Sequence, residues 1–203
     1  HRLWKRDAIE ATGAREGSRV LDIASGTGDL AIALARKVGA TGTVFATDIN
    51  VSMLKAGIGR MKQAGVSAEV LQCDCEALPF KDGAFDAVTV SFGLRNMTHK
   101  DKARSEMLRV VKPGGRVVVL EFSHCAKWLR PLYDLYSFWF MPWISRLITG
   151  DGGNYRYLAE SIRLHPDQKT LAALMSAVGF DEVTWCNKTF GICALHVGRK
   201  PVN

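Results

Sequence analysis

The feature that most constrains the fold is a regular alternation of short apolar runs and longer helical patterns over the first 120 of the 203 residues. Alternation at this rhythm is typical of consecutive βαβ units that build a parallel sheet. The predicted strands are residues 19–24, 43–47, 68–72, 85–91 and 116–122, and the predicted helices are residues 30–38, 52–64 and 101–111. Asn50 or Ser52 is the predicted N-cap of the second helix, and residues 112–115 are predicted to end the third.

The alternation stops after residue 122. Residues 126–165 are rich in aromatic side chains and are predicted to form a helical insert or lid within a single domain that spans residues 1–203. A helix is predicted over residues 167–178, and residues 180–187 and 191–198 are predicted to form an antiparallel pair at the sheet edge. The predicted fold class is therefore α/β and Rossmann-like: a mostly parallel seven-stranded sheet with an antiparallel C-terminal strand pair and helices on both faces.

Composition excludes a disordered chain, because 47% of the residues are hydrophobic and 23% are charged. Cys73 and Cys75 flank Asp74, and no further ligands stand at zinc spacing, so no metal site is predicted. The opening residues lack the apolar run of a signal peptide, and the apolar stretch at 128–148 is interrupted by charges and prolines. These features predict reduced thiols and a cytoplasmic location without a membrane span.

The net charge of +7 is concentrated in one segment. Residues 95–130 hold nine basic and three acidic side chains, which accounts for six of the seven net positive charges. Such a segment can attract nucleic acid, anionic lipid or an acidic substrate, and it can equally be a solvated helix face.

A glycine-containing loop, residues 22–28, follows the first predicted strand. Glycines there let the backbone approach a ligand closely, and the N-terminus of the next helix offers N–H groups. Asp48 stands twenty residues beyond Gly28, at the end of the second strand, where a carboxylate can accept hydrogen bonds from both ribose hydroxyls. The two features predict an adenosine-containing ligand at the carboxyl ends of the strands, and a tight turn with a structural aspartate is the alternative.

The same loop also fits the dinucleotide pattern GxGxxG/A, which by itself is weak. Three features favour S-adenosylmethionine over a nicotinamide dinucleotide. Asp22 precedes the glycines by four residues, where it can orient an ammonium group. Asp74 follows the third strand, where a carboxylate can accept from an adenine amino group, and the closing antiparallel pair is typical of methyltransferases.

Longer motifs resemble those of the UbiE family of quinone C-methyltransferases. DIASGTGD at residues 22–29 resembles the family's DLAGGTGD, with Ser25 in place of a glycine. The other matching motifs are EALPF at 76–80, SFGLRN at 91–96, RVVKPGGRVVVLEFS at 109–123, YRYLAESI at 155–162 and HPDQ at 165–168. The resemblance runs from HRLWKR at the start to ALHVGRK near the end. Cys75 departs from the alanine that is usual in the family.

The resemblance implies a class I S-adenosylmethionine-dependent methyltransferase that C-methylates a polyprenyl hydroquinone ring in menaquinone or ubiquinone biosynthesis, or in both. The implied cofactor-binding residues are Asp22, Ala24, Gly26, Thr27, Gly28, Asp48, Ile49, Met53, Asp74, Cys75 and Ser91. Arg95 and Asn96 are the implied catalytic residues: Arg95 stabilises the developing phenolate, and Asn96 or an ordered water positions the hydroxyl. His165 and Tyr155 are alternative proton carriers, and His124 is predicted near a ligand edge.

The resemblance also implies partners. A polyprenyl quinol is the expected substrate, with the aromatic insert as a wall for its tail, and the basic segment is expected to contact an anionic membrane from the cytoplasmic side, or in the mitochondrial matrix of a eukaryote. A quinone-biosynthesis complex or a homodimer is also expected. No nucleic acid is expected, because the aromatic residues cluster with aliphatic ones rather than with basic ones. The alternatives are a methyltransferase for another small phenolic, lipid or RNA substrate, and a non-catalytic adenosine-binding subunit.

Overall fold

Seven strands of the described chain form one sheet in the order β3-β2-β1-β4-β5-β7-β6. The computed structural model describes residues 2–124 and 160–202, so most of the predicted insert at 126–165 lies outside the described residues. The strands are β1 (Arg19–Ile23), β2 (Thr43–Asp48), β3 (Glu69–Gln72), β4 (Phe85–Ser91), β5 (Val111–Phe122), β6 (Asp181–Lys188) and β7 (Cys193–Arg199). Strands β1 to β5 are parallel to one another, and β7 is antiparallel to both β5 and β6.

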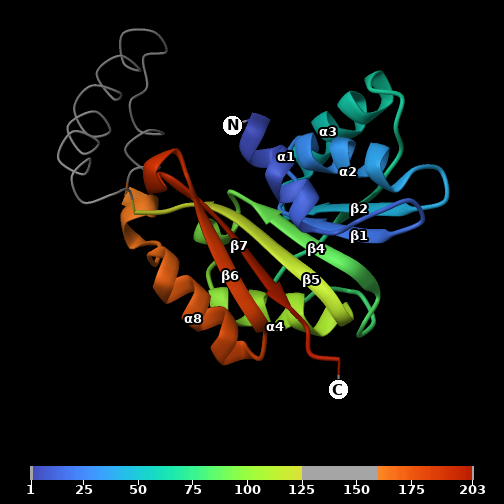
Figure 1. Cartoon of the computed structure of the whole chain (residues 1–203). Helices are drawn as coiled ribbons and strands as arrows, with labels where there is room; N and C mark the ends of the chain where they lie inside the picture. Colours follow the sequence, from blue (N-terminus) through green and yellow to red (C-terminus); the bar gives the residue numbers. More distant parts are fainter. Residues whose placement is uncertain (1, 125–159, 203) are drawn as a thin grey trace, which may run out of the picture.

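Helices cover both faces of this sheet. They are α1 (Arg2–Ala11), α2 (Asp29–Val38), α3 (Val51–Gln63), α4 (Lys100–Val110) and α8 (Gln168–Val178), with short 3-10 turns η1 (Leu94–Asn96) and η3 (Thr189–Gly191). Figure 1 shows α1, α2 and α3 on one side of the sheet and α4 and α8 on the other. The predicted fold class is confirmed. No helix in residues 2–124 or 160–202 is long and apolar enough to cross a membrane.

Alternating strand residues supply two separate cores. Leu21 and Val88 lie fully buried in the cluster that includes side chains of α4 and α8. Val20 and Ala87, their neighbours in sequence, belong to the opposite cluster with α2 side chains such as Leu34. This alternation follows from the two-residue period of a strand, and it explains why the central strands are apolar on both faces.

The order of the strands creates the crevice in which a ligand can bind. β1 pairs with β2 on one side and with β4 on the other, so the chain leaves the neighbouring carboxyl ends of β1 and β4 in opposite directions. The connections after these two strands therefore diverge and leave space between them.

Several element boundaries follow the predicted signals. Asn50 caps α3: its Oδ1 accepts hydrogen bonds from the N–H groups of Ser52 at 2.9 Å and Met53 at 3.3 Å. Asp167 caps α8 in the same way, and Gly179 ends that helix at a φ of 115°. Asn50, rather than Ser52, is thus the confirmed cap.

Two elements differ from the prediction. The third predicted helix ends before residues 112–115 as predicted, but the strand predicted from residue 116 begins at Val111. Gly114 N–H donates to Lys200 O and Lys200 N–H donates to Gly115 O, which continues the pairing with the chain after β7. A register shift between Phe85 and Ala87 accommodates this stretch. The N-terminal helix α1 was not predicted, although Trp4, Ala8 and Ala11 recur at helical spacing and pack on β5 and β7.

Candidate active site

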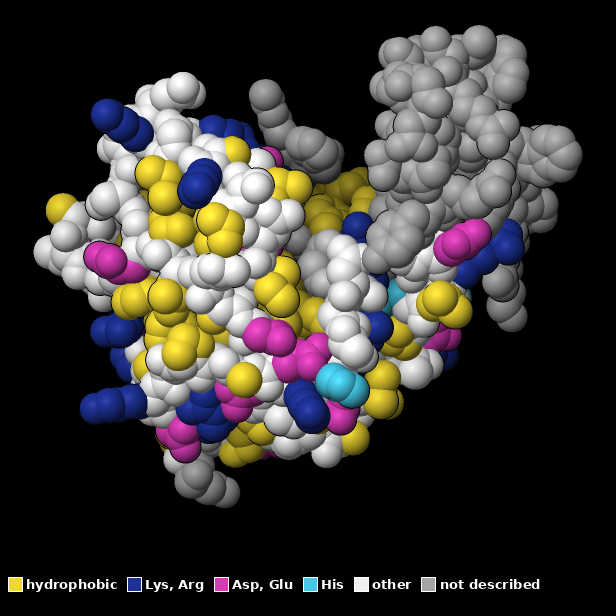
Figure 2. All heavy atoms as spheres, turned by 180° about the vertical axis from the view of Figure 1, so that it is seen from behind, with side chains coloured by type: hydrophobic (Ala, Val, Ile, Leu, Met, Phe, Trp, Pro, Cys, Tyr) yellow, Lys and Arg dark blue, Asp and Glu magenta, His cyan; other side chains and the backbone are white. Residues whose placement is uncertain are grey.

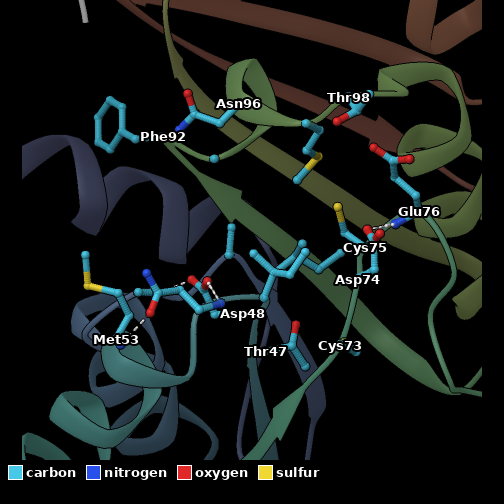
Figure 3. A pocket seen from close by; sticks show the side chains of 17 residues that line it. Thr47, Asp48, Met53, Cys73, Asp74, Cys75, Glu76, Phe92, Asn96 and Thr98 are labelled. Atoms are coloured by element: carbon cyan, nitrogen blue, oxygen red, sulfur yellow. Dashed lines mark hydrogen bonds between the residues drawn. The ribbon is translucent and has the colours of Figure 1, made fainter. Parts of the chain in front are cut away.

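A cavity of about 390 Å³ opens at the carboxyl ends of the parallel strands (Figure 3). This volume lies within the range of about 300–1,000 Å³ that is common for cofactor and small-molecule sites. The side chains and backbone that line it are Ile23, Ala24, Gly26, Thr47, Asp48, Ile49, Asn50, Met53, Cys73, Asp74, Cys75, Glu76, Phe92, Gly93, Asn96, Met97 and Thr98. We call the residues from β1–β3 and their loops the cofactor wall, and those from residue 92 to residue 98 the acceptor wall.

The glycine-containing loop forms the base of the cofactor wall. Ala24 and Gly26 both line the cavity, and their φ values are 51° and 56°. Space is open where a Cβ on Gly26 would stand, so the loop backbone is accessible there. Gly28 is required for its backbone, because its φ is 79°, and a Cβ on it would also lie 2.7 Å from Met61 Cε, which would have to move.

Asp48 holds the loop and faces the cavity. Its Oδ2 accepts a hydrogen bond from Gly26 N–H at 2.9 Å, and its Oδ1 accepts one from Asn50 N–H at 2.9 Å. These bonds fix the carboxylate at the end of β2 (Figure 3). A carboxylate oxygen accepts more than one hydrogen bond, so this geometry leaves acceptor capacity for ligand hydroxyls.

Asp22 lies directly behind the loop and is 1% exposed. Thr89 Oγ1 donates to its Oδ1 at 2.7 Å, whereas its Oδ2 is buried with no hydrogen-bond partner. Burial raises the pKa of Asp22 to about 7, while the Thr89 hydroxyl and the Lys5 ammonium act in the opposite direction. A buried carboxylate oxygen without a partner is costly, and a ligand cation within reach would satisfy it.

Two cations clamp the loop from outside. Arg60 on α3 donates to the carbonyl and the hydroxyl of Thr27 and also pairs with Asp29. Lys5 on α1 pairs with the same Asp29 at 2.8 Å. Thr27 therefore binds Arg60 in the described structure and does not line the cavity.

The far end of the cofactor wall combines apolar and acidic groups. Ile49 and Met53 are 66% and 46% exposed, and Asp74 is fixed by a hydrogen bond from Glu76 N–H to its Oδ1 at 2.9 Å. An exposed apolar rim beside a carboxylate suits a flat ring that carries an amino group. Burial raises the pKa of Cys75 to about 12, so this thiol stays protonated. Among the described residues, no group of His, Cys, Asp and Glu side chains is arranged to hold a metal ion.

The acceptor wall begins with a strained turn after β4. Phe92 has a φ of 59°, an unfavourable value for an aromatic residue. Its neighbour Gly93 is required there, because a Cβ on Gly93 would lie 2.5 Å from the Cβ of Ala24. Figure 3 shows Phe92, Asn96 and Thr98 on the side of the cavity opposite Asp48 and Met53. Asn96 is exposed to this cavity.

Arg95 stands beside Asn96 but is turned away from the cavity. Its Nη1 donates to Glu121 Oε1 at 2.8 Å and to Phe92 O, and its backbone N–H donates to Glu121 Oε2 at 3.2 Å. Burial raises the pKa of Glu121, and the positive charge of Arg95 opposes that rise. The Nε of Arg95 is buried without a hydrogen-bond partner. The ion pair thus fixes the turn that presents Phe92 and Asn96.

The predicted site residues fall into two groups. Seven predicted cofactor residues line the cavity together with Asn96; the seven are Ala24, Gly26, Asp48, Ile49, Met53, Asp74 and Cys75. Asp22, Thr27, Gly28, Ser91 and Arg95 are not among its lining residues and lie behind it or beside it. Tyr155 is outside the described residues. His165 is 2% exposed, and burial lowers its pKa to about 4, which keeps its imidazole neutral at physiological pH.

Other lining residues were not predicted from the sequence. Glu76 is the clearest case, since its Oε1 accepts from His99 N–H at 2.7 Å and so ties the acceptor wall to the loop after β3. Phe92, Gly93, Met97 and Thr98 complete that wall. Glu76, Phe92 and Gly93 lie inside the two motifs EALPF and SFGLRN, and membership of these motifs is the signal that could have identified them.

The basic segment 95–130 does not form one exposed patch in its described part, residues 95–124. Arg95 pairs with Glu121, Arg109 pairs with Glu106 and Asp82, and Lys112 pairs with Asp86. Two other cations of the segment are not free surface charges: Arg104 is 7% exposed, and Arg116 donates to Ala11 O. The charge excess seen in the sequence therefore serves internal contacts to a large extent.

Fold and cavity together define the class I methyltransferase architecture. Two solved structures share it over nearly the whole chain. A SAM-dependent methyltransferase from Aquifex aeolicus superposes with a TM-score of 0.71 at 18% identity, covering 98% of this chain and 92% of that one. The [4+2]-cyclase SpnF superposes with a TM-score of 0.75 at 20% identity, covering 100% and 81%. At such identities the likeness concerns the fold.

Sequence comparison gives the family. The model of the ubiE/COQ5 methyltransferase family matches residues 1–200. The ubiquinone/menaquinone biosynthesis C-methyltransferase UbiE of Pseudomonas entomophila is 59% identical over 204 residues, which cover 99% of this chain and 80% of that protein. The UbiE protein of Cupriavidus pinatubonensis is 57% identical over 200 residues, covering 98% and 82%. The chain belongs to the ubiE/COQ5 family and is an S-adenosylmethionine-dependent C-methyltransferase.

Proposed function

We propose that this chain transfers a methyl group from S-adenosylmethionine to a ring carbon of a polyprenyl hydroquinone in menaquinone biosynthesis, ubiquinone biosynthesis or both. The observation that supports the proposal best is one continuous cavity that joins two different walls. Asp48 and Asp74 give the cofactor wall its acceptors, and Phe92 and Asn96 give the acceptor wall an aromatic face and an amide. The names of the close relatives support the choice of substrate.

The cofactor wall has the donor and acceptor set that S-adenosylmethionine requires. In this proposal Asp48 accepts from the ribose hydroxyls, and Ile49, Met53, Asp74 and Cys75 surround the adenine. Ala24 and Gly26 bring the loop backbone close to the methionine part. When bound, the cofactor supplies a methyl group activated by its sulfonium.

Asp22 fits the charge of that cofactor. Its buried Oδ2 has no hydrogen-bond partner, and an ammonium group directly or through water would provide one. Thr27, Gly28 and Ser91 are proposed to act by holding the loop and the end of β4 rather than by lining the cavity. Arg60 assists them through its bonds to Thr27.

The acceptor wall is proposed to hold the quinol ring against Phe92. Loss of a phenolic proton places negative charge on the ring carbons, so a donor that meets the phenolate oxygen favours the reactive form. The Asn96 amide is the donor on the cavity surface. Arg95 stays a predicted catalytic residue: because Glu121 and Phe92 O hold its Nη1, a contact with a phenolate would use its Nε or Nη2.

The finer predictions on partners and location stay predictions. They are a cytoplasmic enzyme, or a mitochondrial matrix enzyme in a eukaryote, with peripheral contact to an anionic membrane and with a homodimer or a quinone-biosynthesis complex. Vesicle binding that weakens with salt would support the electrostatic part of this proposal.

A methyl-transfer assay tests the proposal. Purified protein is incubated with isotope-labelled S-adenosylmethionine and a reduced demethylated quinol, and mass spectrometry locates the label. We expect the label on a ring carbon. A label on oxygen, or no transfer to quinols with binding of the cofactor intact, would contradict the proposed reaction.

The role of Asn96 is tested with the same assay. We expect Asn96→Ala to lower kcat by about 10²-fold with little change in cofactor affinity, because the amide is proposed to meet charge that develops during the reaction. Gln63→Ala, which removes an exposed amide at the end of α3, is the matched control. Equal activity of the two variants would remove Asn96 from the mechanism.

A further inference from the structure

A series of aromatic rings leaves the cavity at Phe92. The centroid of the Phe92 ring lies 4.7 Å from that of Phe122 and 6.5 Å from that of Trp4 on α1. Phe92 lines the cavity, and all three side chains are only partly buried. We call these three residues, with Leu3 and Phe190 at the outer end, the aromatic track. The track connects the acceptor wall to the outer surface near α1 and η3.

Polar contacts fix the two sides of the track. Trp4 Nε1 donates to Thr189 Oγ1 at 3.2 Å, and Lys188 pairs with Asp7 at 2.6 Å. These contacts join α1 to the turn between β6 and β7, although the two segments lie more than 180 residues apart in sequence. The indole nitrogen has its hydrogen bond, and the charges of Lys188 and Asp7 offset each other at this edge of the track.

The outer end of the track exposes large apolar side chains. Leu3 is 64% exposed and Phe190 is 66% exposed. Thr189 and Phe190 have φ values of 46° and 57°, in the left-handed region that is unfavourable for residues with a Cβ. Backbone strain of this kind clusters at ligand-binding sites, and large exposed apolar side chains mark binding surfaces. Figure 2 shows the opposite face of the molecule, where exposed hydrophobic side chains lie among charged ones.

We propose that the aromatic track binds the isoprenoid tail of the quinol substrate, from the ring against Phe92 past Trp4 to Leu3 and Phe190. This inference rests on the proposed function. A polyprenyl chain carries only methyl groups and double bonds, so an aromatic surface with satisfied polar groups suits it. The pair between Lys188 and Asp7 adds no net charge to the track, so its aromatic and aliphatic carbons suit a neutral tail.

The experiment measures kcat/KM for quinol acceptors that carry no tail, one isoprene unit or three. Wild type is compared with Leu3→Gln, Phe190→Asn and the double variant. Glutamine maintains the helix at position 3, and asparagine tolerates the left-handed backbone at position 190. The matched control is Ile58→Gln, because Ile58 is 50% exposed on α3 and lies outside the track. All assays are run in detergent-free buffer without vesicles.

We expect wild-type kcat/KM to rise with tail length. The double variant should lose about tenfold more kcat/KM with the three-unit quinol than with the tail-less quinol, and each single variant should lose a part of this. Ile58→Gln should match wild type on all three acceptors. Leu3→Gln changes an exposed helix position, so it tests the track even where the turn variant folds poorly.

Three results would overturn the inference. The first is a double variant whose tail-length dependence equals that of Ile58→Gln. The second is an equal loss on all three acceptors, which would mean that the track supports the ring or the fold. The third is an unchanged tail-length dependence with reduced binding to anionic vesicles, which would make the track a membrane-binding surface. A wild-type enzyme that methylates none of the acceptors would overturn the proposed function together with this inference, and that result is distinguishable from the other three.

Discussion

On the cofactor wall, Asp48 and Asp74 each accept a hydrogen bond from the backbone N–H two residues further along the chain. On the acceptor wall, the carboxylate of Glu121 comes from 26 residues away, is 1% exposed and neutralises the Arg95 guanidinium. The first wall therefore combines these local contacts with one bond from Gly26 N–H to Asp48, and its carboxylates face the cavity. The second wall is built by a buried ion pair that faces away from the cavity.

The difference indicates which property a substitution on each wall should change. Loss of a carboxylate on the cofactor wall is expected to remove the proposed ligand contact and little of the core, because these groups lie at the surface of the cavity. Loss of Glu121 leaves the positive charge of Arg95 inside the protein without its counter-charge. Substitutions on the two walls should therefore separate into effects on ligand affinity and effects on stability.

The largest expected effect is on stability at the acceptor wall. Glu121→Ala leaves Arg95 buried without its partner, and we expect a loss of about 3–5 kcal/mol in the free energy of unfolding. Urea unfolding measures it. The double variant Arg95→Met/Glu121→Leu should recover most of the loss, because no charge then remains buried.

Asp82→Ala is the control for this prediction, since Asp82 is 78% exposed and pairs with Arg109. Asp82→Ala should lower the free energy of unfolding by less than about 1 kcal/mol. If Glu121→Ala costs no more than Asp82→Ala, the ion pair does not hold the acceptor wall, and the contrast between the two walls fails.

The next effect is on affinity at the cofactor wall. We expect Asp48→Ala to weaken S-adenosylmethionine binding about 10–100-fold, because a charge-assisted contact to the ribose is lost and the Gly26 and Asn50 N–H groups lose their acceptor. Calorimetric titration gives the affinity, and a melting curve shows whether the fold is intact. Unchanged affinity would remove Asp48 from the cofactor site.

The smallest effect concerns pH and Asp22. Its pKa of about 7 means that the group is largely protonated at pH 6 and largely ionised at pH 8. If the ionised form binds the cofactor ammonium, the affinity for S-adenosylmethionine should be about tenfold weaker at pH 6 than at pH 8. Asp22→Asn should bind weakly at both pH values. A wild-type affinity that changes as little between pH 6 and pH 8 as that of the variant would contradict the contact.

The raised pKa of Asp22 also makes the stability of the folded protein depend on pH. The native state holds a proton on Asp22 up to about pH 7, whereas an unfolded aspartic acid releases it near its ordinary pKa of 3.8. The folded protein without ligand therefore binds more protons between these values, and this group makes the protein less stable as pH rises from about 4 to 7. Asp22→Asn should remove this contribution, which urea unfolding at pH 5 and pH 7.5 can measure.

Much of the cofactor wall could be predicted from the sequence because its signals are local. The loop at 22–28 and Asp48 stand at spacings that βαβ geometry requires, and the cap of α3 follows Asp48 by two residues. On the acceptor wall, the SFGLRN motif predicted only Asn96 among the residues that line the cavity. That motif contains no sign that Arg95 would be held by Glu121, because the partner stands on another strand.

The sequence by itself determined the order of strands and helices, the ends of α3 and α8, and the family, since periodicity, capping residues and motifs act over a few neighbouring positions. Only the tertiary structure decided which polar groups face the cavity and which pair inside the protein. It joined Trp4 to Phe92 and Thr189, and it turned Arg95 toward Glu121. Such contacts depend on packing between segments far apart in sequence, and that packing is fixed only when the sheet is complete.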